Sequence, residues 1–338
     1  MNKKLLTVDI AEGIGGPSAT AVFKQTQLPQ DRIEQIIVLK KAFKKLRILG
    51  HQLSKLSVVS PLNTSNEISF RSVQVRGVDE KGDAALETGA NCGNSMIAST
   101  LVALREKFDI VLPKGMIVRV RNIDTNFTAD MEVVNDLEKQ SMIFDMHLPD
   151  LKGKIPKETL LEQTTPTWFV SINGEQIPVT TLNIVNPYII ASSIHVGVKD
   201  AETLLHVENC TNEILDKVKK IRNMIMQTLA LPSDSEFPKI AIVHVKGSTI
   251  SARTMYLNKW HPGLPITGAI SLAIASQIKG SIVDFGQNTV PTSEITVQTP
   301  KEQESIFIKT SKKSEALVNF IVRNRKAIVI QQGIEICY

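Results

Sequence analysis

The sequence has few cysteines and no spacing that would give them a structural use. Its 338 residues include three cysteines, Cys92, Cys210 and Cys337, and no CxxC pair. Zinc sites and disulfide frameworks depend on such spacing, so we predict neither a metal site nor a disulfide. No apolar run approaches the roughly 18 residues of a membrane-spanning helix, and Asp9 and Glu12 interrupt the first apolar stretch. We therefore expect a reduced, cytoplasmic protein that does not bind membranes.

A strong excess of one charge is also lacking. The net charge is +5, and the densest basic run, residues 40–45, fits the solvated face of a helix over 30–46. We therefore do not expect a nucleic-acid partner. The Gly-rich turn at residues 12–18 is not a GxGxxG loop followed by a helix and a ribose-binding acid, which argues against a dinucleotide cofactor. Gly15 and Gly16 would still let the backbone approach a ligand closely.

The stretch Asn91–Ser95 has the composition of a helix start. It precedes residues 96–107, where apolar side chains recur at helical spacing and small residues cover the other faces. Cys92 would then lie at a helix N-terminus, where free N–H groups and the helix dipole favour an anion and lower the pKa of a thiol. Cys92 is therefore either a reactive thiolate or a small buried apolar residue at a helix cap.

A second stretch of the same kind lies in the other half of the chain. Residues 265–269 precede a small-residue helix predicted over 270–280, and superposing the two stretches places Cys92 on Pro265. Strand-like sequence surrounds both helices. Two such helix N-termini facing each other across a cleft would bind a small molecule that carries two negative charges.

Lys55 stands between Ser54 and the apolar strand 56–59. If it is partly buried there, desolvation would favour its neutral form, which can act as a base. The alternative is an ordinary solvent-facing lysine at the start of a strand.

The remaining pattern is rich in strands and lacks βαβ alternation, so we predict the α+β class. Each half would be a mixed β-sheet wrapped round one central helix. We place an N-terminal domain at 1–180, rejoined by about 315–338, and a C-terminal domain at 181–314. The first would carry Lys55 and Asn91–Asn94, and the second the motif at 265–269.

Several motifs, in the same order along the chain, resemble the 2-methylaconitate cis-trans isomerase family. Its most distinctive motif is matched by Asn91-Cys92-Gly93-Asn94. The other matches are Gly15-Gly16-Pro17-Ser18, Ser54-Lys55-Leu56-Ser57, Asn186-Pro187 and Pro265-Ile266-Thr267-Gly268-Ala269 with His261 before it.

The resemblance implies the diaminopimelate epimerase-like fold, with the active site between the N-termini of the two central helices. It also implies a cofactor-independent isomerase that moves a proton on a small unsaturated di- or tricarboxylate such as methylaconitate or aconitate. Lys55 and Cys92 would be the catalytic pair. The expected substrate-binding residues are Ser18, Asn91, Gly93, Asn94, Ser95, His261, Thr267, Gly268 and Ala269. The expected partner is this small anionic carboxylate, and the only protein assembly we consider is a homodimer.

The sequence also departs from the family. Pro265 stands where racemase and epimerase relatives carry their second cysteine, which argues against two-thiol racemisation, and Ala19 replaces a usual lysine. Two alternatives remain. An amino-acid racemase or epimerase would need a second thiol or carboxylate facing Cys92, and Cys210 does not match that position. A non-catalytic anion-binding protein on the same scaffold is the other.

Overall fold

The structure is a computed structural model, and its contacts divide the chain into two compact units. Unit 1 is Met1–Asp150 with Asn324–Tyr338, and unit 2 is Leu151–Arg323. The residues described are 5–137, 140–161, 165–206, 211–232, 235–256, 258–285, 292–311 and 313–337.

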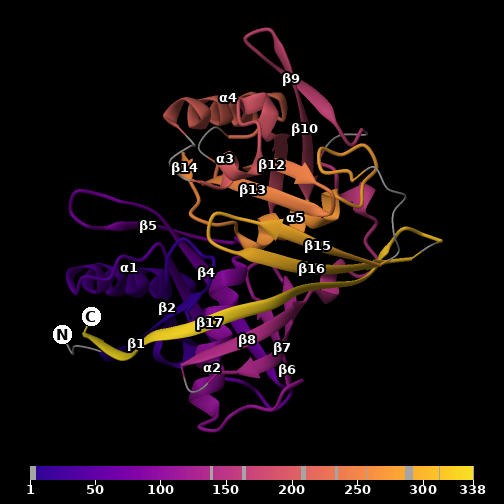
Figure 1. Ribbon diagram of the computed structural model, residues 1–338. Coiled ribbons are helices and arrows are strands. Elements are labelled where there is room, and N and C mark those ends of the chain that lie inside the picture. Colours follow the sequence, from indigo (N-terminus) through magenta and orange to yellow (C-terminus); the bar gives the residue numbers. More distant parts are fainter. Residues whose placement is uncertain are drawn as a thin grey trace. The chain divides into compact units, whose positions relative to one another are not determined.

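Unit 1 is built on a β-sheet whose strand pairings close on themselves (Figure 1). Its strands are β1 Leu5–Gly13, β2 Thr20–Lys24, β3 Lys55–Val59, β4 Glu67–Val78, β5 Ala84–Thr88, β6 Ile117–Asn122, β7 Thr128–Asp136, β8 Ser141–His147 and the later part of β17 Leu317–Cys337. The pairings run β1–β2–β3–β4–β6–β7–β8–β17 and return to β1, with β5 as a hairpin on β4. The β2–β3 and β4–β6 pairs are parallel, and each has a helix in its crossover connection.

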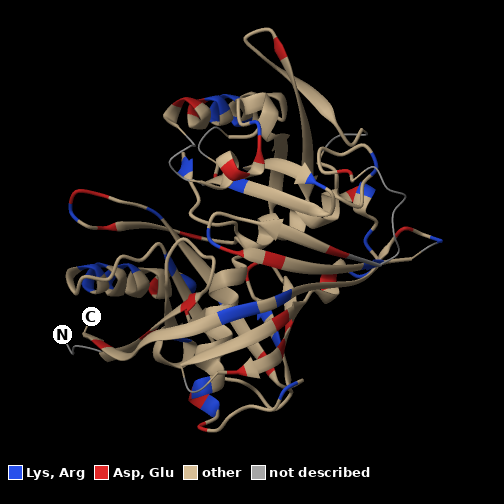
Figure 2. Ribbon diagram, viewed as in Figure 1, with Lys and Arg blue, Asp and Glu red and all other residues tan. Residues whose placement is uncertain are grey.

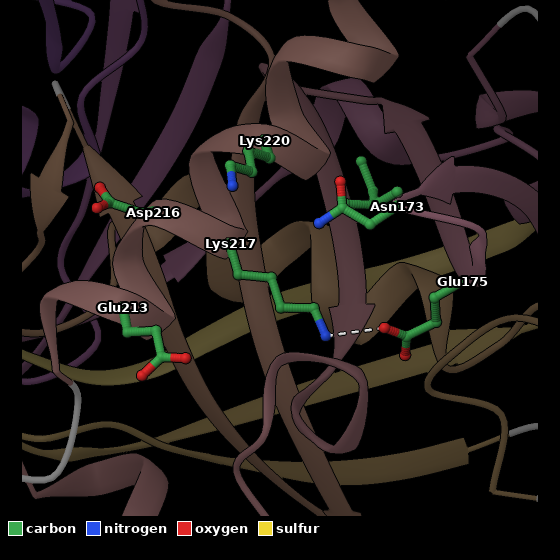
Figure 3. Close-up of a pocket in the computed structure, with 7 residues that line it drawn as sticks. Asn173, Glu175, Glu213, Asp216, Lys217 and Lys220 are labelled. Carbon is green, nitrogen blue, oxygen red and sulfur yellow. Dashed lines mark hydrogen bonds and ion pairs between the residues drawn. The ribbon is translucent and has the colours of Figure 1, made fainter.

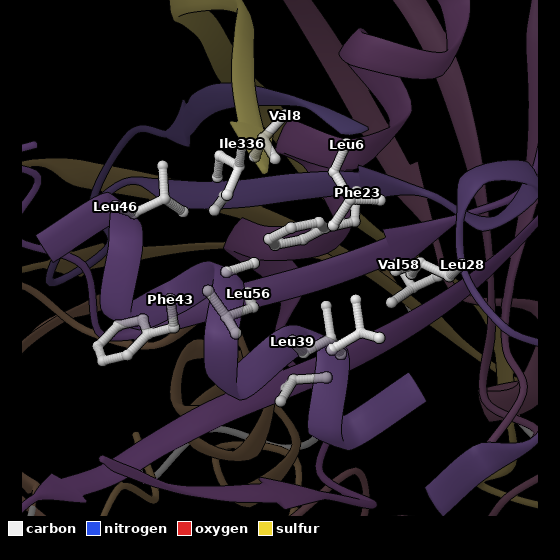
Figure 4. Packing of buried hydrophobic residues seen from close by; sticks show 14 of the residues in the cluster. Leu6, Val8, Phe23, Leu28, Leu39, Phe43, Leu46, Leu56, Val58 and Ile336 are labelled. Atoms are coloured by element: carbon white, nitrogen blue, oxygen red, sulfur yellow. The ribbon is translucent and has the colours of Figure 1, made fainter. Parts of the chain in front are cut away.

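The two helices of unit 1 lie on opposite faces of this sheet. Helix α1, Arg32–Ile48, is capped by Asp31 and packs its apolar side on strand residues such as Phe23 and Leu56 (Figure 4). Its lysines 40, 41 and 45 are exposed, which agrees with the solvated face expected for this run, and Figure 2 shows the basic residues along α1. Helix α2, Gly93–Lys107, is buried from Asn94 to Leu104 and contacts β1, β2, β3, β4, β6 and β8. It is the central helix of unit 1.

Unit 2 repeats the order of these strand pairs, although among its described residues no pairing joins the two ends of the sheet. Its strands are β9 Trp168–Ile172, β10 Glu175–Asn183, β11 Pro187–Ser192, β12 Lys239–Lys246, β13 Thr249–Tyr256, β14 Lys259–Trp260, β15 Thr292–Gln298, β16 Gln303–Thr310 and the first part of β17. Its helices are α3 Ala201–Leu205, α4 Asn212–Thr228 and α5 Ile266–Ala275. Short 3-10 helices complete the chain at Gln25–Gln27, Pro149–Leu151, Pro156–Thr159 and Ser193–Val196.

The repeat is visible in the order and direction of the strand pairs. In unit 2, β11–β12 and β13–β15 are the parallel pairs, α4 lies in the connection before β12, and α5 lies in the connection before β15. Apolar side chains of α4 pack on β11 and β12, as those of α1 do on β2 and β3. Helix α5 is buried throughout and is the central helix of its unit. The expected α+β fold, with two similar halves round central helices, is confirmed.

Two boundaries differ from the sequence-based expectation. The second central helix was expected over 270–280, but α5 covers Ile266–Ala275 because its first turn follows Pro265 directly, as prolines near helix starts favour. Residues 151–180 belong to unit 2 by their contacts, whereas the sequence placed them in the first domain. The reason is that β9 pairs with β10, which in turn pairs with β11.

Candidate active site

Helix α2, which follows Cys92, lacks the side-chain oxygen cap that α1 has. Asp31 accepts a hydrogen bond from the Glu34 N–H at the start of α1, whereas no such bond forms at α2, which lies wholly within the described residues. Cys92 takes the capping position with extended backbone angles, φ −130° and ψ 98°. It remains partly exposed, while the helix from Asn94 onward is buried. Cys92 therefore stands at the electropositive end of a buried helix.

Matching periodicities of strand and helix bring Lys55 to this end. Side chains two apart on β3 share a face with about 6.6 Å between them, and residues four apart on a helix advance about 6 Å. Ser57 Oγ lies 2.7 Å from Ser99 Oγ of α2. Two residues earlier on β3 is Lys55, and four residues earlier on α2 is Ser95. Lys55 therefore lies beside the first turn of α2. Lys55, first residue of β3, is 7% exposed.

The electrostatics of Cys92 reflect this placement. Burial raises the pKa of the thiol, but the charge of Lys55 and hydrogen bonds from Ser95 and Lys55 outweigh it, so the pKa is lowered overall. The Ser95 hydroxyl donates to Cys92 Sγ over 3.2 Å. A thiolate beside an ammonium group, in low-dielectric surroundings, is the arrangement that activates a cysteine for proton transfer. This favours the reactive reading of Cys92 over the apolar cap.

The Gly-rich turn packs against the first turn of α2. A Cβ atom on Gly13 would lie 2.4 Å from the Asn94 carbonyl oxygen, and one on Gly16 would lie 3.2 Å from the Asn94 side-chain nitrogen. Arg325 of β17 donates to the Ile14 carbonyl over 2.5 Å and to Asn94 Oδ1 over 3.4 Å. The glycines therefore permit close packing of the chain on α2, and they fix the helix end that carries Cys92.

We expect Gly13→Ala to destabilise unit 1 by about 1–3 kcal/mol, because the new methyl group overlaps the Asn94 backbone. Gly77→Ala is the matched control, since a Cβ at this strand glycine has no atom within 4 Å. Its effect should stay within about 0.5 kcal/mol. Urea unfolding of both variants measures the difference, and equal midpoints would contradict the packing role of Gly13.

Two further residues expected at the substrate site make structural hydrogen bonds. Asn91 Oδ1 accepts from Asn122 Nδ2 at 2.9 Å and from the Thr125 hydroxyl at 2.7 Å, which anchors the loop before α2. Ser18 Oγ lies 2.6 Å from Ser54 Oγ, directly before Lys55 in the chain. Both residues thus border the Cys92–Lys55 pair and support the segments that carry it.

The predicted residues of unit 2 gather at the start of α5. Thr267, Gly268 and Ala269 form its first turn and are buried, and no side-chain cap closes this helix, which lies within the described residues. The Tyr188 hydroxyl lies over Gly268, 2.8 Å from where a Cβ would stand. His261 is buried, and its Nδ1 accepts from the Gly263 N–H over 3.2 Å.

A lysine that the sequence pattern did not single out occupies the place of Lys55 in unit 2. Lys239 is the first residue of β12, as Lys55 is of β3, and both are buried. Pro265 occupies the place of Cys92, so Lys239 pairs instead with the buried carboxylate of Glu236 at 3.0 Å. The lysine–thiol combination therefore belongs to unit 1.

A surface cavity of about 600 Å³ lies elsewhere in unit 2 (Figure 3). It is lined by the turn before β10 and by one side of α4, with Lys217 paired to Glu175 at 2.9 Å. Its lining mixes acidic and basic side chains and contains none of the catalytic or substrate-binding residues predicted from the sequence. The described residues contain no group of three or more His, Cys, Asp or Glu that could hold a metal, and no helix in them is long and apolar enough to cross a membrane. Cys210 lies outside the described residues.

Comparison with known proteins yields matches among solved structures. A methylitaconate-delta-isomerase superposes with a TM-score of 0.68 at 16% identity, covering 99% of this chain and 96% of that one. A hydroxyproline epimerase from Agrobacterium vitis gives 0.59 at 10% identity, covering 100% and 92%. The chain shares their fold. A probable proline racemase from Agrobacterium radiobacter K84 also matches, with a TM-score of 0.53 at 8% identity over 98% and 91%. No protein-family model and no curated protein matches the chain.

Proposed function

We propose that this protein is a cofactor-independent isomerase that shifts a double bond in a small unsaturated di- or tricarboxylate. The observation that carries the proposal is the pairing of Lys55 with Cys92 at the start of α2, which lowers the pKa of the thiol. A thiolate is a suitable base for a carbon acid, and a fixed ammonium group stabilises the negative charge that the reaction creates.

The reaction is a reversible proton transfer. The Cys92 thiolate takes an allylic proton, so that a C–H bond breaks, an S–H bond forms and the electron pair enters a dienolate. Lys55 and the free N–H groups of Gly93 and Asn94 stabilise the charge on the conjugated carboxylate. The thiol then returns the proton to the other end of the allylic system, and the double bond moves.

The position of the pair favours isomerisation over racemisation. Lys55 and Cys92 belong to one unit and interact directly, so they approach a substrate carbon from the same side. An allylic shift can remove and return its proton on one face. Inversion of a stereocentre by two bases needs a second group on the opposite face, and Pro265 stands at the position in unit 2 that corresponds to Cys92.

In this proposal the substrate carboxylates bind to backbone N–H groups at the helix N-termini. In unit 1 the first turn of α2 offers N–H groups beside Cys92. In unit 2 the N–H groups of Gly268 and Ala269 already donate to the Pro265 carbonyl, at 2.8 and 3.1 Å, so Thr267 is the residue of the uncapped first turn of α5 that we propose for anion binding there. A methylitaconate isomerase is among the proteins of the same fold. Substrates with two or three carboxylates are therefore the first to test.

The test is proton NMR of the purified protein in D2O with methylitaconate, methylaconitate, cis- and trans-aconitate and itaconate. We expect deuterium to enter an allylic position of one compound and a new isomer to form. With the Cys92→Ala variant, the same compound should stay unchanged. If none of these compounds changes and the α-proton of proline or hydroxyproline exchanges instead, the protein is a racemase. Binding of a carboxylate without any exchange would make it a non-catalytic binding protein.

A further inference from the structure

A chain of hydroxyl groups leads from the strand β2 to the sulfur of Cys92. Thr20 Oγ1 lies 3.1 Å from Ser95 Oγ, and Ser95 Oγ lies 3.2 Å from Cys92 Sγ. Thr20 and Ser95 are 2% and 0% exposed. Both hydroxyls are therefore removed from bulk water and depend on protein partners for their hydrogen bonds.

Each of these hydroxyls has one proton to donate, and this fixes the direction of the chain. Among the described residues, Ser95 is the hydrogen-bond partner of the Thr20 hydroxyl. If Ser95 donated to Thr20, the Thr20 proton would be buried without an acceptor and Cys92 would lose the hydrogen bond from the Ser95 hydroxyl, which is unfavourable. If Thr20 donates to Ser95 and Ser95 donates to Cys92, both protons are used.

We propose that Thr20 is a positioning residue that directs the Ser95 hydroxyl toward Cys92 Sγ and so holds the sulfur in its anionic, proton-accepting form. Its effect on turnover rests on the proposed function, whereas its effect on the thiol does not. Thr20 acts through Ser95 and is not placed in contact with substrate.

Strand pairing explains how Thr20 reaches this position. Thr20 and Lys55 are direct neighbours in the parallel β2–β3 register. The hydroxyl and the ammonium group thus approach the start of α2 from adjacent strands, one through Ser95 and the other directly.

Unit 2 supplies an internal comparison. Its positions equivalent to Thr20 and Lys55 are Tyr188 and Lys239, which are neighbours in the β11–β12 register. The position of Ser95 is taken by Gly268, and the Tyr188 hydroxyl fills the space of the missing side chain. The unit that has a proline in place of the thiol also has no hydroxyl at the position of Ser95, as expected if that hydroxyl serves the thiol.

Lys55 is the charged group whose electrostatic field lowers the pKa of Cys92. Arg325 of β17 reaches Asn94 in the same helical turn. Most titratable and charged groups on the other strands packed against α2 have partners of their own. They are Asp9 with Gly333, Lys24 with Glu106, Glu67 with Arg121, Arg71 with Asp124, Arg76 with Glu87, Arg119 with Asp130, Asp145 with the Asn324 N–H and His147 with Glu132. Glu12 of β1 is the remaining carboxylate on these strands.

The experiment measures the pH dependence of iodoacetamide alkylation of Cys92 in the full chain with Cys210 and Cys337 replaced by serine. We expect Thr20→Val, which keeps the shape but removes the donor, to move the midpoint upward by roughly 0.5 pH unit, the worth of a weak hydrogen bond. Thr20→Ser should restore the original midpoint. Ser95→Ala should raise it further, and Thr20→Val should add nothing in the Ser95→Ala background.

An unchanged midpoint in Thr20→Val, or the same shift with and without Ser95, would overturn the proposal. Thermal unfolding verifies that each variant is folded, and Thr20→Ala carries the same expectation if Thr20→Val does not fold. Because alkylation needs no substrate, it tests the hydroxyl chain even if every carboxylate fails to react. Failure of the proposed isomerase function can therefore be told apart from failure of the proposed role of Thr20.

Discussion

Replacing Cys92 by alanine is expected to lower kcat/KM for the isomerised carboxylate by about a thousandfold or more, since general acid–base groups contribute roughly 10²–10⁴ to such rates. The sulfur is the atom on which the lowered pKa, the Ser95 hydrogen bond and the Lys55 charge converge. Proton NMR in D2O gives both the turnover and the deuterium exchange. Substrate binding should be retained, because the N–H groups at the start of α2 remain.

Cys92→Ser provides a stricter version of the same test. Serine is among the best helix-capping residues, so this variant should fold at least as well as the native chain. Its hydroxyl ionises far less readily than a thiol, so turnover should still be lost. Cys337→Ser, which alters an exposed thiol in β17, is the control and should react normally. Turnover of Cys92→Ala within tenfold of the native chain would exclude the sulfur from the chemistry.

The sequence carries the information for the central helices because both depend on local pattern. The small residues after Cys92 and after Pro265 allow a helix to be buried on all sides, and α2 and α5 are so buried. The alternation over 68–78 likewise predicts a strand, which is observed as β4. Features of this kind follow from the period of side chains along one element.

The contacts of the site are set by pairings that no local pattern reveals. Lys55 meets Cys92 because β3 and α2 pack in register, with Ser57 against Ser99 one step further on. The family resemblance suggested that pair, whereas residue chemistry alone left open whether Lys55 is a partly buried base or an ordinary strand lysine. Nothing in the sequence indicated a role for Thr20. It neighbours Lys55 only because β2 and β3 pair in parallel, and α1 lies between these two strands in the chain.

The boundary near 180 illustrates the same limit. Residues 149–167 are rich in prolines and lysines and have the composition of a surface connection, while 167–172 and 177–184 have the pattern of two strands about a turn at Asn173-Gly174. Their assignment to unit 2 depends on partners distant in sequence, since Gly153 N–H donates to the Leu317 carbonyl and Leu317 N–H to the Lys154 carbonyl. Composition can locate a connection, but only the pairing shows which sheet it joins.

Lys55→Met is expected to lower kcat/KM by about a hundredfold or more at neutral pH and to move the alkylation profile of Cys92 to higher pH. The sign follows from the charge: the ammonium group stabilises the thiolate, so its removal raises the pKa of Cys92 and leaves less thiolate at any given pH below the new pKa. If holding the thiolate is the whole role of Lys55, raising the pH should restore the rate. If Lys55 also stabilises the dienolate, a deficit should persist at high pH.

Lys24→Met is the matched control for this prediction. Lys24 lies at the end of the adjacent strand β2 and pairs with Glu106 on the surface of unit 1, so its loss should leave both the rate and the titration unchanged. Lys55→Arg keeps the charge but replaces a compact ammonium group by a planar fork, so it should preserve much of the thiolate while impairing turnover. A Cys92 titration that is the same in Lys55→Met as in the native chain would show that the ammonium does not set the ionisation of the thiol. In that case the electrostatic pairing on which the proposed chemistry depends would have to be abandoned.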